Sequence, residues 1–273
     1  MGQVQALVRA CHPEPTVAVT AVSAAVATAA GRGGGTAWVA AAVLAGQLSV
    51  GWSNDYLDRD RDVRTGRPDK PVSTGRVPAR TVGLAALVAA VAMVPLSFGS
   101  GPRAGAVHIV AVASAWSYNL RLKATVLSAL PYVVSFGLLP GLVTLGLPGH
   151  PWPPAWVVLA GALLGAGAHF ANVLPDIDDD LLTGIVGLPH RLGAVASSVL
   201  SAVLVLAASA VLVVGPRGRV GVGPLLGLVV ATALVAYGVA DVRRSGSRTA
   251  FRMTLVVAAL DVVLLVARAP ALH

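Results

Sequence analysis

Acidic residues are rare in this chain and gather in two short segments. Nine of the 12 aspartates and glutamates lie in residues 54–69 and 172–184. Residues 54–66 read NDYLDRDRDVRTG, and residues 172–184 read NVLPDIDDDLLTG, so the second segment matches the first without a gap after a shift of 118 residues. The matched pairs include both Asn residues, three Asp residues and the closing Thr-Gly. This correspondence predicts an internal repeat of four helices.

The spacing within each segment places oxygen ligands on one face of a helix. At about 100° per residue, positions four apart form a stripe along the helix. Two such stripes facing each other would make a cage for a hard divalent cation, and Mg²⁺ suits it because it takes one or two carboxylates and leaves its other positions to water and phosphate. The stripes are Asn54, Asp58 and Asp62 in the first segment, and Asn172, Asp176 and Asp180 in the second.

Simpler interpretations apply to some of these acids. Charges beside an apolar helix are commonly solvated, which suits Asp60, Asp69, Asp178 and Asp179, and we expect Arg59 and Arg61 to face solvent too. An EF-hand loop is excluded, because Val63 and Asp69 stand where that loop needs glycine and glutamate. The repeated stripes are different, since acids inside a membrane protein are costly and generally functional.

Basic residues follow the acidic segments closely. Arg67, Lys70 and Arg76 come after the first segment, and Tyr118, Arg121 and Lys123 lie together between the two. Lys70 and Lys123 are the only lysines among 20 basic residues. Cations beside a carboxylate cage suggest a ligand that is itself anionic, such as a phosphate ester. An ordinary cytoplasmic excess of basic residues explains the loops equally well, but not the acidic stripes.

The rest of the chain consists of apolar elements that must position these groups. Of 273 residues, 56% are hydrophobic and only 12% are charged, where soluble domains carry about 25% charged residues. Continuous apolar runs of roughly 20 residues suit helices that cross a membrane. We therefore predict an all-α, polytopic membrane bundle forming one domain over residues 1–273. Its nine segments are 15–30, 36–54, 78–99, 104–118, 124–147, 155–174, 192–214, 220–240 and 250–268.

Charge distribution predicts how the bundle sits in a cell membrane. Most Lys and Arg residues fall at one set of helix ends if the N-terminus is cytoplasmic, and the acidic segments fall at the same ends. The net charge of +8 is then a basic face toward anionic lipid head groups or an anionic substrate. Nucleic acid is not an expected partner, because no soluble basic domain is present. The single cysteine, Cys11, excludes an internal disulfide.

A pocket that is lined with metal ligands and cations and opens into an apolar bundle suits an amphiphile with a polyphosphate head and a hydrocarbon tail. An isoprenyl diphosphate fits that description. The cations would stabilise departing pyrophosphate, and a dry cavity would protect the allylic carbocation from water.

These residues resemble the UbiA superfamily of intramembrane prenyltransferases. The first segment is similar to its N-D-x-x-D-x-x-x-D motif, and the second to its D-x-x-x-D motif. RPDKPVSTG at 67–75 resembles the family's basic loop, and Tyr118 with Lys123 resembles its inner-loop Tyr and Lys. The resemblance implies nine helices and two Mg²⁺ ions that bridge a diphosphate. It assigns the metal to Asn54, Asp55, Asp58, Asp62, Asn172, Asp176 and Asp180, and catalysis to Asp58, Asp62, Asp176 and Asp180. It also implies that Arg67, Lys70 and Lys123 contact the diphosphate, and we expect Tyr118 and Arg121, which lie beside Lys123, to do the same.

The acceptor of the prenyl group stays open. HPEPT at 12–16 stands where many members carry Arg-Pro, and no arginine is placed to bind an aromatic carboxylate. A branch that resembles this pocket cyclises the carbocation to terpenes, and Trp116, Tyr132 and Phe136 could stabilise such a cation or simply pack. A cation or proton-coupled transporter is a further alternative, since paired acids and repeats occur there.

Overall fold

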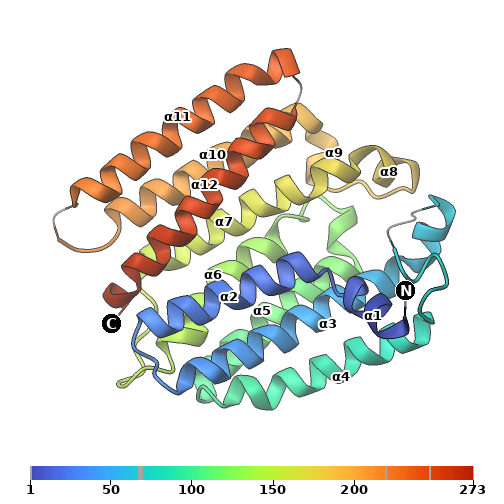
Figure 1. Cartoon of the computed structure of the whole chain (residues 1–273), viewed down its shortest axis with the longest axis horizontal. Coiled ribbons are helices and arrows are strands. Elements are labelled where there is room, and N and C mark those ends of the chain that lie inside the picture. Colours follow the sequence, from blue (N-terminus) through green and yellow to red (C-terminus); the bar gives the residue numbers. More distant parts are fainter. Residues whose placement is uncertain (1, 67–69, 219, 246, 273) are drawn as a thin grey trace.

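The computed structural model describes residues 2–66, 70–218, 220–245 and 247–272, and these form helices joined by turns, with no strand among them (Figure 1). The α-helices are α1 (Gln3–Ala10), α2 (Pro13–Ala29), α3 (Gly35–Arg64), α4 (Ala79–Phe98), α5 (Pro102–Leu120), α6 (Leu130–Thr144), α7 (Ala155–Val173), α8 (Ile177–Leu182), α9 (Leu188–Leu192), α10 (Ala194–Val214), α11 (Val222–Ser245) and α12 (Ser247–Arg268). Three short 3₁₀ turns are η1 (Leu122–Ala124), η2 (Leu174–Asp176) and η3 (Ala269–Leu272). The predicted all-α class is confirmed.

Each of the nine predicted apolar segments coincides with one long helix, but fewer qualify as membrane spans. Within the described residues, five stretches are long and apolar enough to cross a membrane: Ala79–Phe98, Ala155–Leu182, Ala194–Val214, Val222–Ala240 and Phe251–Leu272. α6 is too short at 15 residues, and α3 carries its charged segment in its last turns. The structure thus supports a multi-pass membrane protein, while nine spans stay a prediction.

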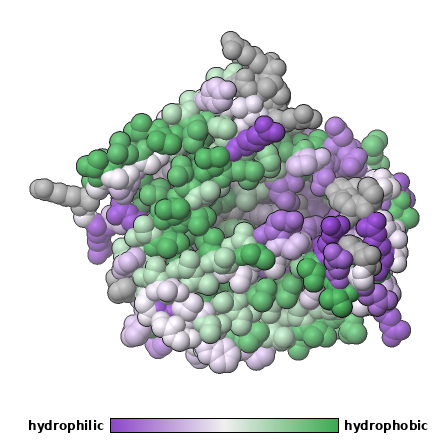
Figure 2. Space-filling view, in the orientation of Figure 1, coloured by the Kyte–Doolittle hydropathy of each residue, from purple (hydrophilic) through white to green (hydrophobic). Residues whose placement is uncertain are grey.

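The long helices pack side by side and enclose a cavity. α3 packs against α2, α4 and α5; α6 packs against α5 and α7; and α10 joins α7 to α12, which returns to α2. In Figure 1, α1, α8 and α9 lie at one end of the bundle, and the C-terminus lies at the other. Figure 2 shows hydrophilic residues gathered at the end that carries α8, and hydrophobic residues over the body. The apolar surface suits contact with lipid tails.

Both acidic segments end on the repeated Thr-Gly pair, which terminates the helix. The Thr65 hydroxyl donates to the Arg61 carbonyl at 3.2 Å, and the Thr183 hydroxyl donates to the Asp179 carbonyl at 3.0 Å. Gly66 and Gly184 then take positive φ values of 64° and 80°, a left-handed conformation that glycine adopts without a Cβ clash. The two acidic segments are therefore closed in the same way.

Candidate active site

The first acidic segment lies in the last turns of α3. Asp55, Asp58 and Asp62 are only 1%, 6% and 3% exposed, so burial raises the cost of their charge unless cations pair with them. Asn54 donates to Asp58 Oδ2 at 3.2 Å and to Asn119 Oδ1 at 3.3 Å. The predicted spacing of four residues thus falls within one continuous helix, with each aspartate turned inward.

The second acidic segment does not lie on one continuous α-helix, which corrects the predicted stripe. α7 ends at Val173, the 3₁₀ turn η2 follows, and α8 starts at Ile177. The break falls at Pro175, which has no backbone N–H and crowds the preceding turn. Asn172 therefore lies on α7 and donates to the Tyr132 hydroxyl at 3.4 Å, whereas Asp176 ends η2 and Asp180 lies on α8.

Basic side chains pair with the buried acids of α3. Lys70 Nζ lies 2.7 Å from Asp55 Oδ1 and 3.1 Å from His12 Nε2. Lys123, which is 9% exposed, donates to Asp58 Oδ1. Burial lowers the pKa of Lys123, and the Asp58 carboxylate beside it acts in the opposite direction. Both lysines of the chain are thus brought to the acidic segment.

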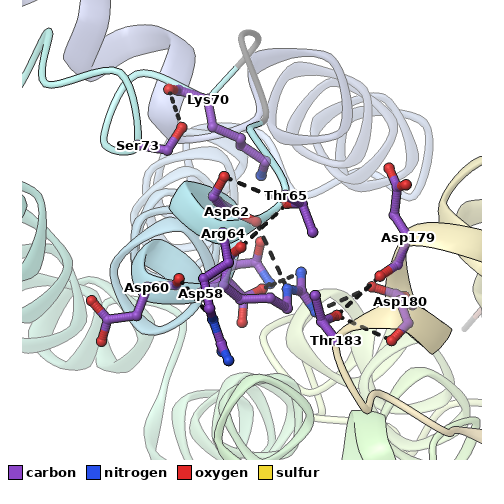
Figure 3. Close-up of polar contacts among 12 residues, drawn as sticks. Asp58, Asp60, Asp62, Arg64, Thr65, Lys70, Ser73, Asp179, Asp180 and Thr183 are labelled. Atoms are coloured by element: carbon purple, nitrogen blue, oxygen red, sulfur yellow. Dashed lines mark hydrogen bonds and ion pairs between the residues drawn. The ribbon is translucent and has the colours of Figure 1, made fainter.

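Arg61 corrects another expectation, because it turns into the site rather than toward solvent. Its guanidinium lies 3.1 Å from Asp58, 3.8 Å from Asp62 and 3.1 Å from Asp180. Figure 3 shows Asp179 and Asp180 of α8, with Thr183 just after its end, on the side opposite Asp58 and Asp62 of α3. The three-residue spacing between Asp58 and Arg61 was the available signal, since residues i and i+3 are neighbours on a helix.

Of the other predicted diphosphate contacts, one lies at the cavity, one is exposed and one lies outside the described residues. Tyr118 is half-buried at the cavity, where its ring meets the Tyr132 ring edge-on at 5.2 Å. Arg121 is exposed just after α5 and takes part in no ion pair found within the described residues. Arg67 lies outside the described residues. His190, which the sequence did not single out, lies 3.1 Å from Asp180 Oδ2.

A cavity of about 290 Å³ opens beside the two acidic segments. Asn54 and Asn172, the first residues of the two segments, both line it. Its apolar walls include Val19, Val50 and Phe136, and the Tyr132 and Phe136 rings are nearly parallel at 6.3 Å. A smaller cavity of about 40 Å³ continues along Phe136 toward His108. The site therefore joins a charged mouth to an aromatic and apolar interior.

The donor set suits a hard cation, although its oxygens are now held by basic side chains. Carboxylates and amide oxygens are the ligands that Mg²⁺ prefers, and Asp55 Oδ2 is buried without a hydrogen-bond partner. Within the described residues, no three acidic, histidine or cysteine side chains form a group that could hold a metal ion. Ion pairs to Arg61, Lys70 and Lys123 explain this arrangement.

Comparison with known proteins agrees with these features. The model of the UbiA prenyltransferase family matches residues 16–260. The bacteriochlorophyll synthase 33 kDa chain of Cereibacter sphaeroides is 31% identical over 171 residues, covering 55% of this chain and 53% of that protein, so the chain spans about half of its length. The 4-hydroxybenzoate octaprenyltransferase of Alkalilimnicola ehrlichii is 31% identical over 215 residues, covering 74% and 70%. A UbiA homologue from Archaeoglobus fulgidus bound to GPP and Mg²⁺ shares the fold, with a TM-score of 0.66, 15% identity and coverage of 96% and 98%.

Proposed function

The chain belongs to the UbiA prenyltransferase family, and we propose that it transfers the prenyl group of an isoprenyl diphosphate to a small acceptor within the membrane. The observation that carries this proposal is the convergence of both acidic segments and both lysines at the mouth of an aromatic cavity. Asn54 and Asn172 line that cavity, and Lys123 binds Asp58 beside it. A diphosphate at the mouth would place its hydrocarbon tail in the apolar interior.

Magnesium is the proposed cofactor, with two ions expected from the two acidic segments. The residues proposed to hold them are Asn54, Asp55, Asp58, Asp62, Asn172, Asp176 and Asp180. Bound Mg²⁺ supplies positive charge that stabilises a leaving diphosphate. The Archaeoglobus fulgidus relative bound to GPP and Mg²⁺ supports this choice of ligand and metal.

The chain's own residues divide the remaining work. Lys70 and Lys123, now paired with Asp55 and Asp58, are proposed to bind diphosphate oxygens, with Arg67, Tyr118 and Arg121 as further contacts. The carbon–oxygen bond of the donor breaks, and its electron pair leaves with the diphosphate. The apolar cavity keeps water from the resulting allylic cation until the acceptor forms the new bond and loses a proton.

A terpene cyclase is the second candidate, and the aromatic lining favours it specifically. Tyr118 and Tyr132 meet edge-on, and Tyr132 and Phe136 stack, so π faces are available to a carbocation inside the cavity. Purified protein with Mg²⁺ and allylic diphosphates of several lengths separates the two functions. Cyclic products without an acceptor identify a cyclase, whereas turnover that requires an acceptor identifies a transferase.

Alanine variants of one aspartate from each acidic segment test the shared ionisation step. Asp58→Ala and Asp176→Ala should each abolish Mg²⁺-dependent release of pyrophosphate. Asp60→Ala is the matched control, because the Asp60 side chain is 79% exposed and pairs only with nearby Arg59 among the described ion pairs. Release at the wild-type rate from either Asp58→Ala or Asp176→Ala would refute the proposed function and revive the transporter alternative.

The proposed location is a cell membrane, with the N-terminus and the charged mouth on the cytoplasmic side. The hydrophilic end in Figure 2 coincides with the ends of α3 and α8, as the excess of basic residues on cytoplasmic loops predicts. Labelling of single cysteines introduced after α3 and after α6, in a Cys11→Ala background, tests the orientation from either side of sealed vesicles.

A further inference from the structure

Arg61 joins the two acidic segments through ion pairs with both. Its Nη2 lies 3.1 Å from Asp58 Oδ2, and its Nη1 lies 3.1 Å from Asp180 Oδ1. Its Nε lies 3.8 Å from Asp62 Oδ1, and the Arg61 side chain is only 20% exposed. One guanidinium therefore lies between carboxylates of α3 and α8.

In both Asp58 and Asp180, Arg61 pairs with the oxygen that Lys123 or His190 leaves unpaired. The other oxygen of Asp58 pairs with Lys123, and the other oxygen of Asp180 pairs with His190. A metal ion that binds Asp58 and Asp180 must therefore displace a basic side chain from their carboxylate oxygens. Displacing Arg61 is the smallest such change, because this one residue occupies an oxygen of each.

We propose that Arg61 is a built-in counter-cation that holds α8 against α3 before ligands bind and competes with the metal for Asp58 and Asp180. This proposal rests on the proposed function for the identity of the ligands. A displaced guanidinium keeps a planar fork of donors that matches phosphate oxygens. Arg61 would then bind the diphosphate while Asp58 and Asp180 bind the metal. Binding of each ligand would therefore favour binding of the other.

This coupling would weaken the binding of metal in the absence of the donor. Without the donor, the metal must displace a cation whose ion-pair partners among the described residues are all carboxylates of the site itself. With the donor, the same cation gains a new partner at the moment it leaves the carboxylates. The site therefore binds metal and diphosphate together rather than independently.

Binding of Mn²⁺ alone, measured by electron paramagnetic resonance on purified protein, tests the competition without any turnover. Arg61→Gln should bind Mn²⁺ about tenfold more tightly than wild type, since a unit charge near a divalent ion opposes it by about that factor even when well hydrated. Adding inorganic pyrophosphate should tighten Mn²⁺ binding less in Arg61→Gln than in wild type. Unchanged Mn²⁺ affinity and unchanged coupling to pyrophosphate would overturn the proposal.

Arg59→Gln is the matched control, because it removes the same charge from the same helix. Arg59 pairs with the exposed Asp60 at 3.4 Å and stacks on Tyr56, so its loss should leave Mn²⁺ affinity unchanged. An equal effect of Arg59→Gln would show that net charge, and not the bridge, sets the affinity, and would also overturn the proposal.

Thermal unfolding in excess chelator tests the tether, which is the set of ion pairs by which Arg61 holds α8 against α3. Arg61→Gln should melt at a lower temperature than Arg59→Gln without metal. Mg²⁺ should narrow that difference, because Asp58 and Asp180 would then both hold the metal in place of Arg61. Arg61→Lys keeps the charge but cannot pair with three carboxylates at once. Its Mn²⁺ affinity should therefore be close to that of wild type, whereas its melting temperature should stay below that of wild type. If Arg61→Gln and Arg59→Gln melt alike in chelator, the tether is refuted.

Steady-state kinetics separate this idea from the proposed function. Arg61→Gln should raise KM for the diphosphate more than it lowers kcat, because it removes a contact made on binding. If wild type releases no pyrophosphate from any allylic diphosphate, the proposed function fails, yet the Mn²⁺ and melting measurements still decide whether Arg61 competes with metal.

Discussion

Replacing Gly51 by alanine should damage both the stability and the site of this protein. A Cβ on Gly51 would lie 2.1 Å from the Cys11 carbonyl oxygen and 2.7 Å from its carbonyl carbon. Those atoms belong to the backbone between α1 and α2, so no side-chain rotation can relieve the clash. The next residue, His12, takes a φ of 56°, which a residue with a Cβ rarely adopts. The crowded segment therefore has little freedom to move.

The change in the free energy of unfolding caused by Gly51→Ala is the sum of two opposing effects. Alanine in a helix interior is favoured over glycine by about 1 kcal/mol. Forcing an extra methyl group into a packed interior costs about 1–3 kcal/mol and more where backbone must shift. A contact at 2.1 Å against backbone falls at the upper end of that range, so we expect a net loss of about 2 kcal/mol. His12 would also be pushed from Asp55, whose oxygen it now meets at 3.1 Å.

Thermal unfolding in detergent, with pyrophosphate release in parallel, measures both effects. Gly137→Ala on α6 is the matched control, because the nearest atoms to its added Cβ would be Ala162 Cβ at 3.4 Å and the Val158 carbonyl oxygen at 3.5 Å, which are ordinary van der Waals contacts. This variant should melt at or above the wild-type temperature. Gly51→Ala should melt several degrees lower and lose activity. If Gly51→Ala melts as high as Gly137→Ala, the close approach of α3 to Cys11 is wrong.

Two further predictions concern the mouth and the interior of the cavity. Lys123→Met should slow pyrophosphate release on the order of a hundredfold, as removal of one preorganised donor commonly does, and it leaves Asp58 without its buried ammonium partner. The exposed Arg103 in the first turn of α5 provides the control Arg103→Met, and equal losses in both variants would refute a special role for Lys123. Phe136→Ala should join the two cavities that Phe136 lines and shift the preferred donor toward longer prenyl chains in a competition assay, and an unchanged chain-length preference would show that the tail does not pass Phe136.

Much of the fold could be predicted because the apolar runs are long and acids are scarce. The stripe of Asn54, Asp58 and Asp62 followed from a four-residue spacing, and α3 places these residues on one helix. Family and enzyme class agree with the expectation, since the chain belongs to the UbiA prenyltransferase family. The role of each site residue and the internal repeat stay predictions.

Other features depend on tertiary contacts that periodicity cannot supply. Arg61 was expected in solvent because most helix-end arginines are solvated, yet carboxylates from two segments draw it inward. The cavity is shaped by helices far apart in sequence, so neither its volume nor the stacked Tyr132 and Phe136 rings could be inferred. The number of membrane spans stays a prediction, since five stretches of the described residues are long and apolar enough to cross a membrane and α6 has only 15 residues.

The break at Pro175 leaves the second acidic segment freer to move than the first. α3 carries its aspartates on 30 unbroken helical residues packed along three neighbours, so they move only if the bundle moves. Asp180 lies instead on a helix of six residues beyond a 3₁₀ turn, and a small rotation about that turn can reposition it. At the matching point of the first segment stands Leu57, which keeps the helix intact. In the proposed prenyl transfer, adjustment to diphosphates of different tail length or bound depth would thus fall on the second segment, and the first would stay fixed.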